Sequence, residues 1–301
     1  MLRRKQLVKK VVSVVCSIAA AVTMSPIEAL QVNAEEIEAE NQYEFVAELC
    51  QQDNFYELSV GDYVCAVGDL KDADGNFLDS SEWEFCSYEE MKAAFDEMGA
   101  PFCYYSAYDE KDKSYEDAVA FSGKIPEAAF GKYVYYWLGA CSHKDGTVIM
   151  DLFRSKYTVT AWDTKSNYTV EMNDDNKTVS VFSIWNGRSV SVPSTIKVNG
   201  KKYKINAVGS YALEENAKKE LTTLSLSSGI TSIRKEAFKG AGKLKSITIN
   251  GNVTSVGKDA FAGINKNAVF KIKASKKNYD KIVKRIKKSG VPKTVTFKRI
   301  S

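Results

Sequence analysis

Histidine is almost absent from this sequence, since His143 is the only one in 301 residues. A single imidazole excludes multi-histidine metal sites and leaves at most one histidine for acid–base chemistry. The sequence also lacks a Cys-x-x-Cys pair and a glycine-rich phosphate loop. These absences remove the support for zinc, redox-relay and nucleotide-phosphate sites. No cofactor is therefore predicted.

Long apolar segments are missing except at the N-terminus. A stretch of about twelve apolar residues, 11–22, follows a basic start and precedes the small-residue exit Val32-Asn33-Ala34. This layout is typical of a bacterial-type secretory signal, and it is shorter than the roughly twenty residues of a spanning helix. Residues 1–34 are therefore predicted to be a signal peptide cleaved after Ala34. The mature protein is expected to be secreted or held at the cell surface without an integral membrane segment; an uncleaved anchor is the alternative.

The charge of the mature chain divides into two halves of opposite sign. Residues 35–165 hold 10 basic and 28 acidic side chains, whereas residues 166–301 hold 27 basic and 9 acidic side chains. Such asymmetry predicts two domains that face different environments or attract each other. The basic half favours anionic cell-wall polymers, acidic glycans or acidic protein surfaces. Nucleic acid is not predicted, because interleaved aromatic residues are missing. A solvated face that maintains solubility is the alternative explanation of the lysines.

The basic half repeats every 23 residues. The alternating segment Leu221–Leu226 returns as Leu244–Ile249, and Ile230–Phe238 returns as Val253–Phe261; a third copy starts at Ala268. Alternation of apolar and polar residues predicts short strands with one buried face. Because a single coil cannot bury its apolar edge alone, the pattern predicts a stacked parallel solenoid.

Both ends of this array are expected to be capped. Upstream, a stretched copy of the repeat with a hairpin turn at Asn199-Gly200 follows a predicted β-hairpin whose strands are 168–172 and 178–182. Downstream, the apolar spacing predicts an amphipathic helix over 278–288, followed by a last strand through Val295 and Phe297. The helix is predicted to be a lid on the array; a membrane-surface helix is the alternative.

The strings Ile-Thr-Ser-Ile-x-x-x-Ala-Phe (230–238) and Val-Thr-Ser-Val-Gly-x-x-Ala-Phe (253–261) resemble the BspA-type leucine-rich repeats of bacterial surface and secreted proteins. The resemblance covers roughly residues 180 to 301. Leu213 replaces the expected Phe, and Arg234 replaces the usual Gly. The resemblance implies a leucine-rich-repeat solenoid with a non-catalytic role in binding, often adhesion to host or matrix proteins.

The acidic half is predicted to be a mixed α+β domain. A capping box, Ser87-Tyr-Glu-Glu90, opens a helix, and Tyr43–Cys50 is a second helix candidate with Phe45, Val46 and Leu49 on one face. Strands are predicted at 62–67, 133–141, 147–153 and 157–162. This half is rich in aromatic residues. They either line a groove for a sugar or a peptide, or form a hydrophobic core in which the tyrosine hydroxyls reach the surface.

The chemistry of the acidic half rests on five cysteines that remain after the predicted cleavage. They are Cys50, Cys65, Cys86, Cys103 and Cys141. Two disulfides with one free thiol, or five reduced thiols, are both consistent with the sequence. Cys103, followed by His143 and then by Asp151 or Asp163, has the chain order of transglutaminase-like and related cysteine hydrolases. The segment Asp72–Asn76 is predicted to be a tight turn rather than a calcium loop.

The sequence therefore predicts an α+β N-terminal domain (35–165) followed by a short β-rich leucine-rich-repeat solenoid with a C-terminal capping helix (166–301). The predicted function is non-catalytic binding of an extracellular protein or an anionic polymer. A thiol enzyme and a structural module with two docked, oppositely charged domains are the alternatives. Outward strand positions form a shallow polar strip across the coils. The predicted binding residues are Thr223, Ser225, Ser227, Ser246, Thr248, Asn250, Lys271 and Lys273.

Overall fold

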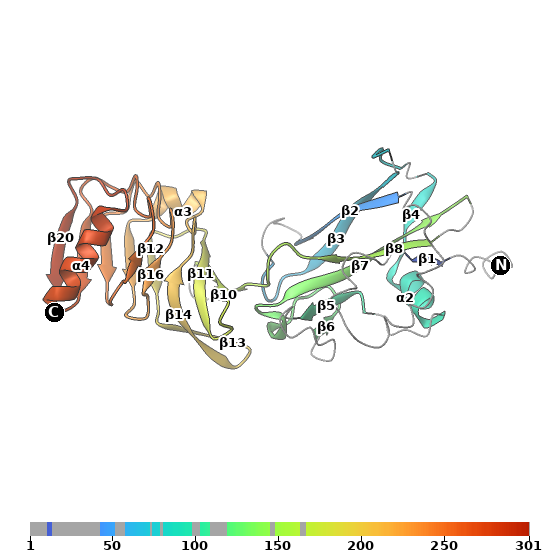
Figure 1. Cartoon of the computed structure of the whole chain (residues 1–301), viewed down its shortest axis with the longest axis horizontal. Coiled ribbons are helices and arrows are strands. Elements are labelled where there is room, and N and C mark those ends of the chain that lie inside the picture. Colours follow the sequence, from blue (N-terminus) through green and yellow to red (C-terminus); the bar gives the residue numbers. More distant parts are fainter. Residues whose placement is uncertain are drawn as a thin grey trace. The chain divides into compact units, whose positions relative to one another are not determined.

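The computed structural model divides the chain into two compact units, Met1–Val159 and Thr160–Ser301 (Figure 1). The described residues are 11–13, 43–51, 58–72, 74–78, 81–97, 103–108, 119–144, 148–162 and 167–300. Apart from the strand Val11–Ser13, the predicted signal peptide lies outside them. The division between the units falls six residues before the predicted boundary at 165/166.

The first unit is built around a six-stranded sheet with the strand order β1–β8–β7–β5–β6, in which β4 also pairs with β7. The side chains of Ala107, Val134 and Tyr136 are buried in its core, together with Tyr105 and Tyr108. These tyrosines therefore belong to a core rather than to a groove. The strands are β1 Val11–Ser13, β4 Trp83–Phe85, β5 Tyr105–Tyr108, β6 Val119–Phe121, β7 Tyr133–Ser142 and β8 Val148–Arg154.

A separate two-stranded sheet overturns the helix predicted over Tyr43–Cys50. Strand β2 (Tyr43–Gln51) pairs antiparallel with β3 (Val64–Asp72) along its whole length. The apolar spacing of 3 and 4 residues imitates a helix, but nine residues of cross-strand pairing override that local signal. The strand predicted over 62–67 is β3, which begins later and extends further.

The predicted helix and turn of the first unit are confirmed. Helix α2 (Tyr88–Glu97) begins with the capping box, in which the Glu90 amide donates to Ser87 Oγ and the Ser87 amide donates to Glu90 Oε2. A short 3₁₀ helix, η5, spans Glu127–Ala129. At the predicted turn, Asp72 Oδ1 accepts hydrogen bonds from the amides of Asp74 and Asn76, as expected for an Asx-type turn.

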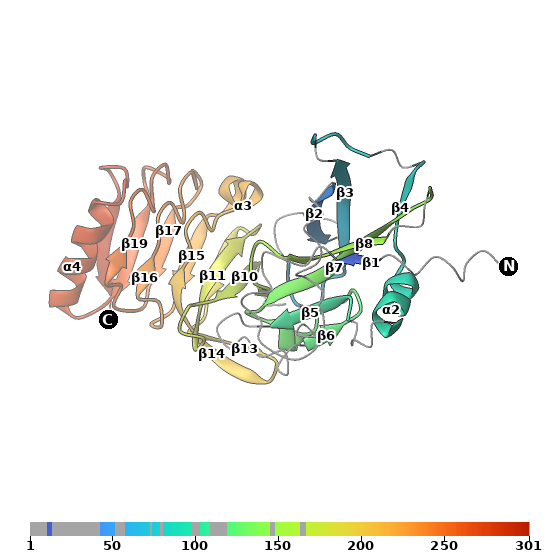
Figure 2. The same ribbon diagram turned by 45° about the vertical axis from the view of Figure 1, so that its right-hand side comes forward.

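The second unit is the predicted parallel array, with two sheets and two helices. A five-stranded sheet has the order β12–β15–β17–β19–β20, and a seven-stranded sheet has the order β18–β16–β14–β11–β10–β9 with β13 paired to β14. Figure 2 shows strands β15, β17 and β19 side by side. The strands are β9 Ala161–Trp162, β10 Tyr168–Met172, β11 Thr178–Ile184, β12 Ser189–Val192, β13 Thr195–Val198, β14 Lys201–Val208, β15 Thr223–Leu226, β16 Ser232–Ile233, β17 Ser246–Ile249, β18 Ser255–Val256, β19 Val269–Lys273 and β20 Thr296–Ile300; the helices are α3 Glu215–Glu220 and α4 Lys276–Lys287.

Most of the predicted elements of this unit form, while the strand predicted at its border with the first unit forms only in part. The antiparallel hairpin β10–β11 and the parallel coils form as predicted. A helix, α4, occupies the range where the amphipathic pattern predicts one. The strand predicted over 157–162 is wrong for most of its length, because only Ala161–Trp162 forms β9.

The 23-residue period is visible in the pairing register. Thr223 pairs with Ser246 and Ser246 with Val269, and Ser232 of the other sheet pairs with Ser255. The first and last coils are longer because extra structure enters at one corner, directly after the strand of the five-stranded sheet. The hairpin β13–β14 enters there after β12, and α4 enters there after β19. In the earlier coils this corner links the two sheets, whereas in the last coil α4 takes the place of a strand of the seven-stranded sheet and the chain returns to the five-stranded sheet as β20.

A row of phenylalanine rings fills the interior of the coils. Phe238 stacks on Phe261 with ring centroids 5.4 Å apart, Phe261 meets Phe270 edge-on at 5.2 Å, and Phe270 stacks on Phe297 at 5.2 Å. Phe238, Phe261 and Phe270 are fully buried. Each ring is covered only when the neighbouring coil is present, so burial couples the coils to one another.

Close stacking also restricts one backbone position in two of the coils. Gly209, Arg234 and Gly257 follow equivalent strand residues, and the amide of each donates to the carbonyl of the preceding coil. A Cβ atom at Gly257 would lie 2.5 Å from the Lys235 nitrogen, and one at Gly209 would lie 2.8 Å from the Val181 oxygen. Glycine is therefore required at these two positions by the approach of the neighbouring backbone.

The substitution Gly257→Ala should lower the unfolding free energy by about 1–3 kcal/mol, because the neighbouring backbone must move to accept the methyl group. Gly242→Ala is the matched control, since its Cβ would meet nothing closer than 4.0 Å and should change stability by less than about 0.5 kcal/mol. Urea unfolding of the full chain measures both values. Equal effects of the two substitutions would contradict the explanation.

Candidate binding surface

The outward face of the five-stranded sheet carries a continuous row of polar side chains. The register aligns Ser191 with Ser225, Ser225 with Thr248, Thr248 with Lys271, and Lys271 with Lys298. These residues alternate along each strand with inward side chains that are buried from β12 to β19. Alternation forces them outward because successive strand residues point to opposite faces. We call this row the polar ladder.

A second outward row runs beside the polar ladder. It contains Ser189, Thr223, Ser246, Val269 and Thr296. Neighbouring strands lie about 4.8 Å apart, so hydroxyl groups recur at that spacing on β12, β15 and β17 in both rows. No outward position on the five strands holds an acidic residue. The face therefore combines hydrogen-bonding hydroxyls with positive charge at its C-terminal end.

The structure places most of the predicted binding residues on this face. Thr223, Ser225, Ser246, Thr248 and Lys271 lie on β15, β17 and β19, and exposed Lys273 ends β19. Asn250 directly follows β17 and donates its amide to the Leu226 carbonyl.

Ser227 differs from the other predicted residues. Its hydroxyl oxygen is buried and has no hydrogen-bond partner within the described part of the chain. The side chain therefore offers no exposed group to a ligand.

The predicted set lacks four polar residues of this face: Ser189, Ser191, Thr296 and Lys298. The signal was present, because Val190-Ser-Val192 and Val295-Thr-Phe297 have the same alternation as the central coils. The β20 segment was predicted as a strand, but its parallel register with β19 depends on the fold of α4 between them.

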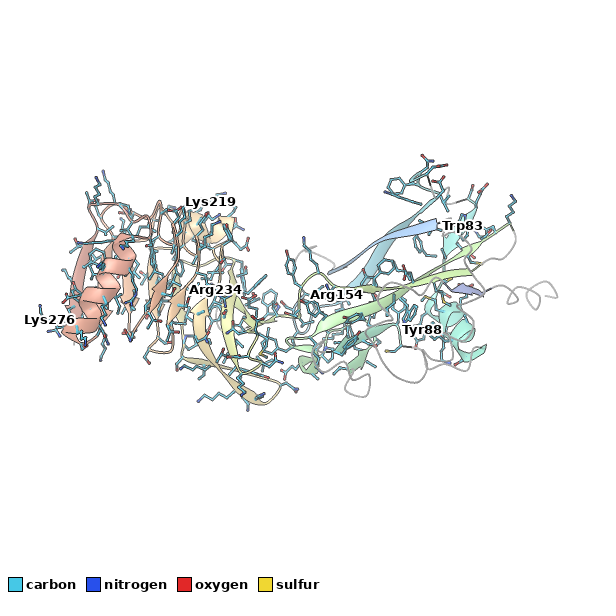
Figure 3. The ribbon with its side chains drawn as sticks, viewed as in Figure 1. Trp83, Tyr88, Arg154, Lys219, Arg234 and Lys276 are labelled. Carbon is cyan, nitrogen blue, oxygen red and sulfur yellow. The ribbon has the colours of Figure 1, made fainter. Side chains whose placement is uncertain are left out.

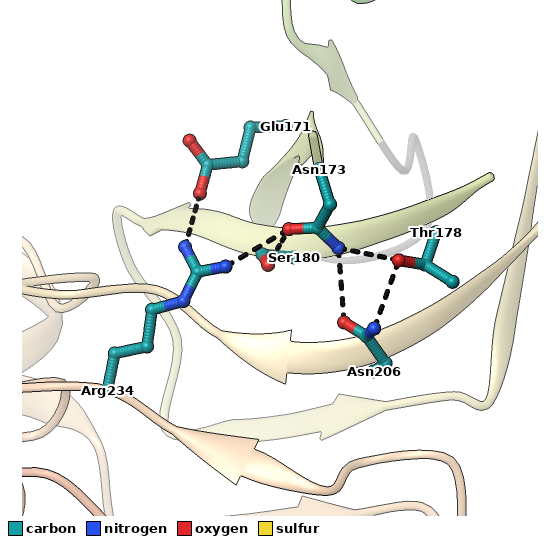
Figure 4. Close-up of polar contacts among 6 residues, drawn as sticks. All are labelled: Glu171, Asn173, Thr178, Ser180, Asn206 and Arg234. Carbon is teal, nitrogen blue, oxygen red and sulfur yellow. Dashed lines mark hydrogen bonds and ion pairs between the residues drawn. The ribbon is translucent and has the colours of Figure 1, made fainter. Parts of the chain in front are cut away.

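A network of polar side chains fastens the hairpin β10–β11 to the next coils (Figure 4). Asn173 Nδ2 donates to Thr178 Oγ1 at 2.9 Å and to Asn206 Oδ1 at 3.1 Å, while Asn173 Oδ1 accepts from Ser180 Oγ at 2.6 Å. Asn206 Nδ2 closes the ring by donating to Thr178 Oγ1 at 3.0 Å. The side chains thus add to the parallel backbone pairing of β11 with β14, at the register irregularity where Asn206 is skipped.

Arg234 adds the charged part of this network. Its Nη1 lies 3.0 Å from Glu171 Oε1, and its Nη2 donates to Asn173 Oδ1 at 3.1 Å. Arg234 stands where neighbouring coils have glycine and uses its side chain to span to the hairpin. Burial nevertheless raises the pKa of the Glu171 carboxyl above its ordinary value, against the opposing effect of Arg234. Desolvation therefore outweighs the attraction of the guanidinium group.

The stability of the protein should depend on the ionisation of Glu171. A carboxyl whose pKa is higher in the folded than in the unfolded chain stabilises the fold when protonated, and this contribution is lost as pH rises through its folded pKa. Glu171→Gln keeps a neutral side chain that can accept from Arg234. The unfolding free energy of the wild type relative to E171Q should therefore fall as pH increases from about 4 to 7. Urea titrations at several pH values test this; a relative gain for the wild type would mean that the ion pair dominates.

The residues of the alternative thiol enzyme are not brought together. Cys103 Sγ donates to the Tyr105 carbonyl, and the neighbouring Tyr104 carbonyl accepts from the Trp137 amide on β7. His143 lies beyond the far end of β7, roughly 16–20 Å away at about 3.3 Å per residue. Asp151 lies on β8 opposite Leu138, and Asp163 lies outside the described residues. Cys103 and His143 therefore do not form a catalytic pair in this structure.

Among the described residues, Cys86 and Cys103 are free thiols. Backbone pairing sets Cys50 on β2 opposite Cys65 on β3, while their side chains lie outside the described part. Burial, with a further contribution from Cys141, raises the pKa of the Cys86 thiol to about 12. A thiol with this pKa is protonated at neutral pH and is a poor nucleophile.

Alkylation should report the burial of Cys86. At pH 8, a pKa near 12 leaves roughly a thousandfold less thiolate than an ordinary cysteine has. Iodoacetamide should therefore modify Cys86 far more slowly in the native protein than in urea, as measured by peptide mass mapping. Equal rates in the two states would contradict the raised pKa.

Comparison with known proteins supports the interpretation of the coils. The family model described as a BspA type leucine rich repeat region matches residues 180–284 in six copies. Residues 180–284 are BspA-type leucine-rich repeats. Repeats of this family are typically non-catalytic. The resemblance predicted from the Ala-Phe strings is thereby confirmed. A search of curated proteins finds no match.

Two solved structures of leucine-rich proteins overlap with part of the chain. A leucine rich cell surface protein from Faecalibacterium prausnitzii is 16% identical over 47% of this chain, with a TM-score of 0.31. The chain spans 42% of the length of that protein. A leucine-rich repeat protein from Bacteroides capillosus is 15% identical over 46% of this chain and 98% of its own, with a TM-score of 0.27. Among the described residues, none of the helices has the length and apolar character needed to cross a membrane.

Proposed function

We propose that the repeat unit is a non-catalytic binding module, secreted or displayed at the cell surface, that contacts an extracellular protein or an anionic polymer through the polar ladder. The observation that carries this proposal is the unbroken alignment of Ser191, Ser225, Thr248, Lys271 and Lys298 across five parallel strands. The family of residues 180–284 is consistent with binding.

The chemistry of the face supports binding rather than catalysis. Its hydroxyl groups donate and accept hydrogen bonds, and its lysines supply charge without an opposing carboxylate on the same strands. Such a shallow surface suits an extended ligand that spans several coils, because each strand repeats the same donors and acceptors. The N-terminal layout of basic, apolar and small residues supports export as the route to that ligand.

The charge division supports a second candidate function. The acidic and basic halves, with net charges of −18 and +18 from the counts above, are expected to attract each other at low salt. A structural module of this kind predicts that separated halves associate in dilute buffer and part at high salt. The binding-module proposal predicts capture of an external partner by the complete chain.

A triple substitution tests the polar ladder. Thr248→Ala, Lys271→Ala and Lys273→Ala together should reduce capture of components from extracellular-matrix and cell-wall fractions by about tenfold or more, while the unfolding midpoint stays close to that of the wild type. All three side chains are partly or fully exposed.

The matched control changes the same residue types on the hairpin β13–β14, with Thr195→Ala, Lys197→Ala and Lys202→Ala. This control should retain capture. Unchanged capture by the ladder variant would place the binding site elsewhere, with the acidic unit as the next candidate.

A further inference from the structure

We infer that the C-terminal end of the solenoid binds an acidic polysaccharide, which passes from the outward face of β19 and β20 around to the outer face of α4. We call this end, residues 266–299, the basic cap. The inference deepens the proposed binding function and rests on it, because it names the ligand class and adds a surface outside the polar ladder.

Charge density is the first argument for this site. Between Lys266 and Arg299 the sequence holds 13 basic residues and a single acidic one, Asp280. All the cations except the half-buried Arg285 are exposed. Within the described part of the chain, no ion pair forms with any of them, whereas Lys218, Arg234 and Lys239 in the preceding coils each pair with a glutamate. The positive charge of the basic cap is therefore uncompensated.

The cations lie on two opposite sides of the last two strands. Lys271, Lys273 and Lys298 point outward, away from the buried Phe270. Helix α4 lies on the opposite side of these two strands, the side that faces the interior of the coils. Its residues Ile282 and Ile286 are buried, and Lys287 Nζ lies 5.8 Å from the centroid of the Phe297 ring, which points inward. Figure 1 shows α4 beside β20, and Figure 3 labels Lys276 on the first turn of the helix. A ligand that contacts both sides must bend around the end of the array.

The outer face of α4 has more charge than folding requires. Lys277, Lys281, Lys284 and Lys288 follow one another at spacings of four, three and four residues, so they form one exposed stripe. Like charges at these spacings destabilise a helix. Protection of the exposed edge strand β20 explains charge at Lys298 and Arg299, but it does not explain a stripe on a helix. Binding of a partner with opposite charge explains the stripe.

The surroundings of the stripe favour a polysaccharide over two other polyanions. No large aromatic side chain of the basic cap is exposed, so the stacking platform typical of single-stranded nucleic-acid binding is missing. The apolar face of α4 is already buried against the coils, so it cannot enter a bilayer, and a flat membrane reaches only one side of the cap.

A polysaccharide matches the neighbouring surface as well. The hydroxyls of Ser225 and Thr248 continue the row that begins at Lys271 and Lys298. Sugar hydroxyls can bond to these groups while acidic substituents contact the lysines. Lysine ammonium groups on flexible stems act as point charges, which suits a chain whose anionic groups vary in position.

Heparin oligosaccharide binding to the full chain in 50 mM salt tests the inference, with hyaluronate to distinguish sulfated from carboxylated glycans. The variant Lys277→Gln, Lys281→Gln, Lys284→Gln and Lys288→Gln should bind heparin at least about tenfold more weakly and lose part of the salt dependence. Replacing the same four lysines by arginine should preserve binding.

The matched control removes four exposed lysines from the hairpin β13–β14, with Lys197→Gln, Lys201→Gln, Lys202→Gln and Lys204→Gln. It has the same net charge as the helix variant and should bind heparin within about twofold of the wild type. Equal weakening of both variants, or no binding by the wild type, would overturn the inference. Equal or tighter binding of single-stranded DNA or of anionic phosphatidylglycerol vesicles would overturn the assignment to polysaccharide.

Two further comparisons separate this inference from the proposed function. If the ladder variant T248A/K271A/K273A keeps its partner while the helix variant loses heparin, the basic cap stands without the polar ladder. If the helix variant keeps heparin while the ladder variant loses its partner, the basic cap fails and the polar ladder stands. In another outcome, the helix variant stops self-associating in sedimentation experiments while it still binds heparin. That result would mean that the basic cap binds the acidic unit of a second copy of the chain instead of a polysaccharide.

Discussion

Stacking between successive coils governs the second unit, because no coil can satisfy its backbone or bury its side chains alone. The interior strands β15, β16, β17 and β19 find their hydrogen-bond partners in the coils before and after them. The rings of Phe238, Phe261, Phe270 and Phe297 likewise cover one another in sequence. The 23-residue period, the glycine positions and the outward polar rows all follow from this requirement.

The two ends of the array differ in the structure that adjoins the outermost coil. At the upstream end, the hairpin β10–β11 is joined to the coils by the network of Asn173, Asn206 and Arg234. At the downstream end, α4 buries Ile282 and Ile286 and leads into the last strand. At the upstream end, Glu171 balances the charge of Arg234. At the downstream end, the lysines of the basic cap form no ion pair with the described residues. The difference explains why the basic cap, and not the upstream hairpin, is the end that suits an anionic ligand.

The sequence predicted the second unit well because its signals are periodic. Strands β15, β17 and β19, the hairpin and the amphipathic helix all follow from spacing alone, and so do the outward positions of Thr223, Ser246 and Thr248. The buried hydroxyl of Ser227 was not predictable, because it depends on how the chain turns after β15. The same applies to Tyr211, Glu236 and Asp259, which adopt positive φ values of 54° to 58° although none is glycine. Contacts between coils impose that conformation.

The first unit was less predictable because its elements depend on distant partners. Tyr43–Gln51 has apolar residues at helical spacing, but pairing with Val64–Asp72 makes it a strand. Cys103 and His143 have the chain order of a catalytic triad, but chain order does not determine where each residue lies along β7. Cys103 lies near Trp137 in the middle of that strand, whereas His143 follows its last residue. Helix α2 was predicted because its capping box and buried face are both local.

One corner of the coil has a further consequence for how this architecture can vary. The residues between β15 and β16, and between β17 and β18, form short connections, yet the equivalent position admits a whole hairpin in the first coil and a twelve-residue helix in the last. Both additions leave the five-stranded sheet intact, because β12 still pairs with β15 and β19 with β20. The seven-stranded sheet ends at β18, since α4 stands in place of its next strand. The outward rows on the five-stranded sheet therefore keep their register although the segments that follow β12 and β19 differ in length and in secondary structure.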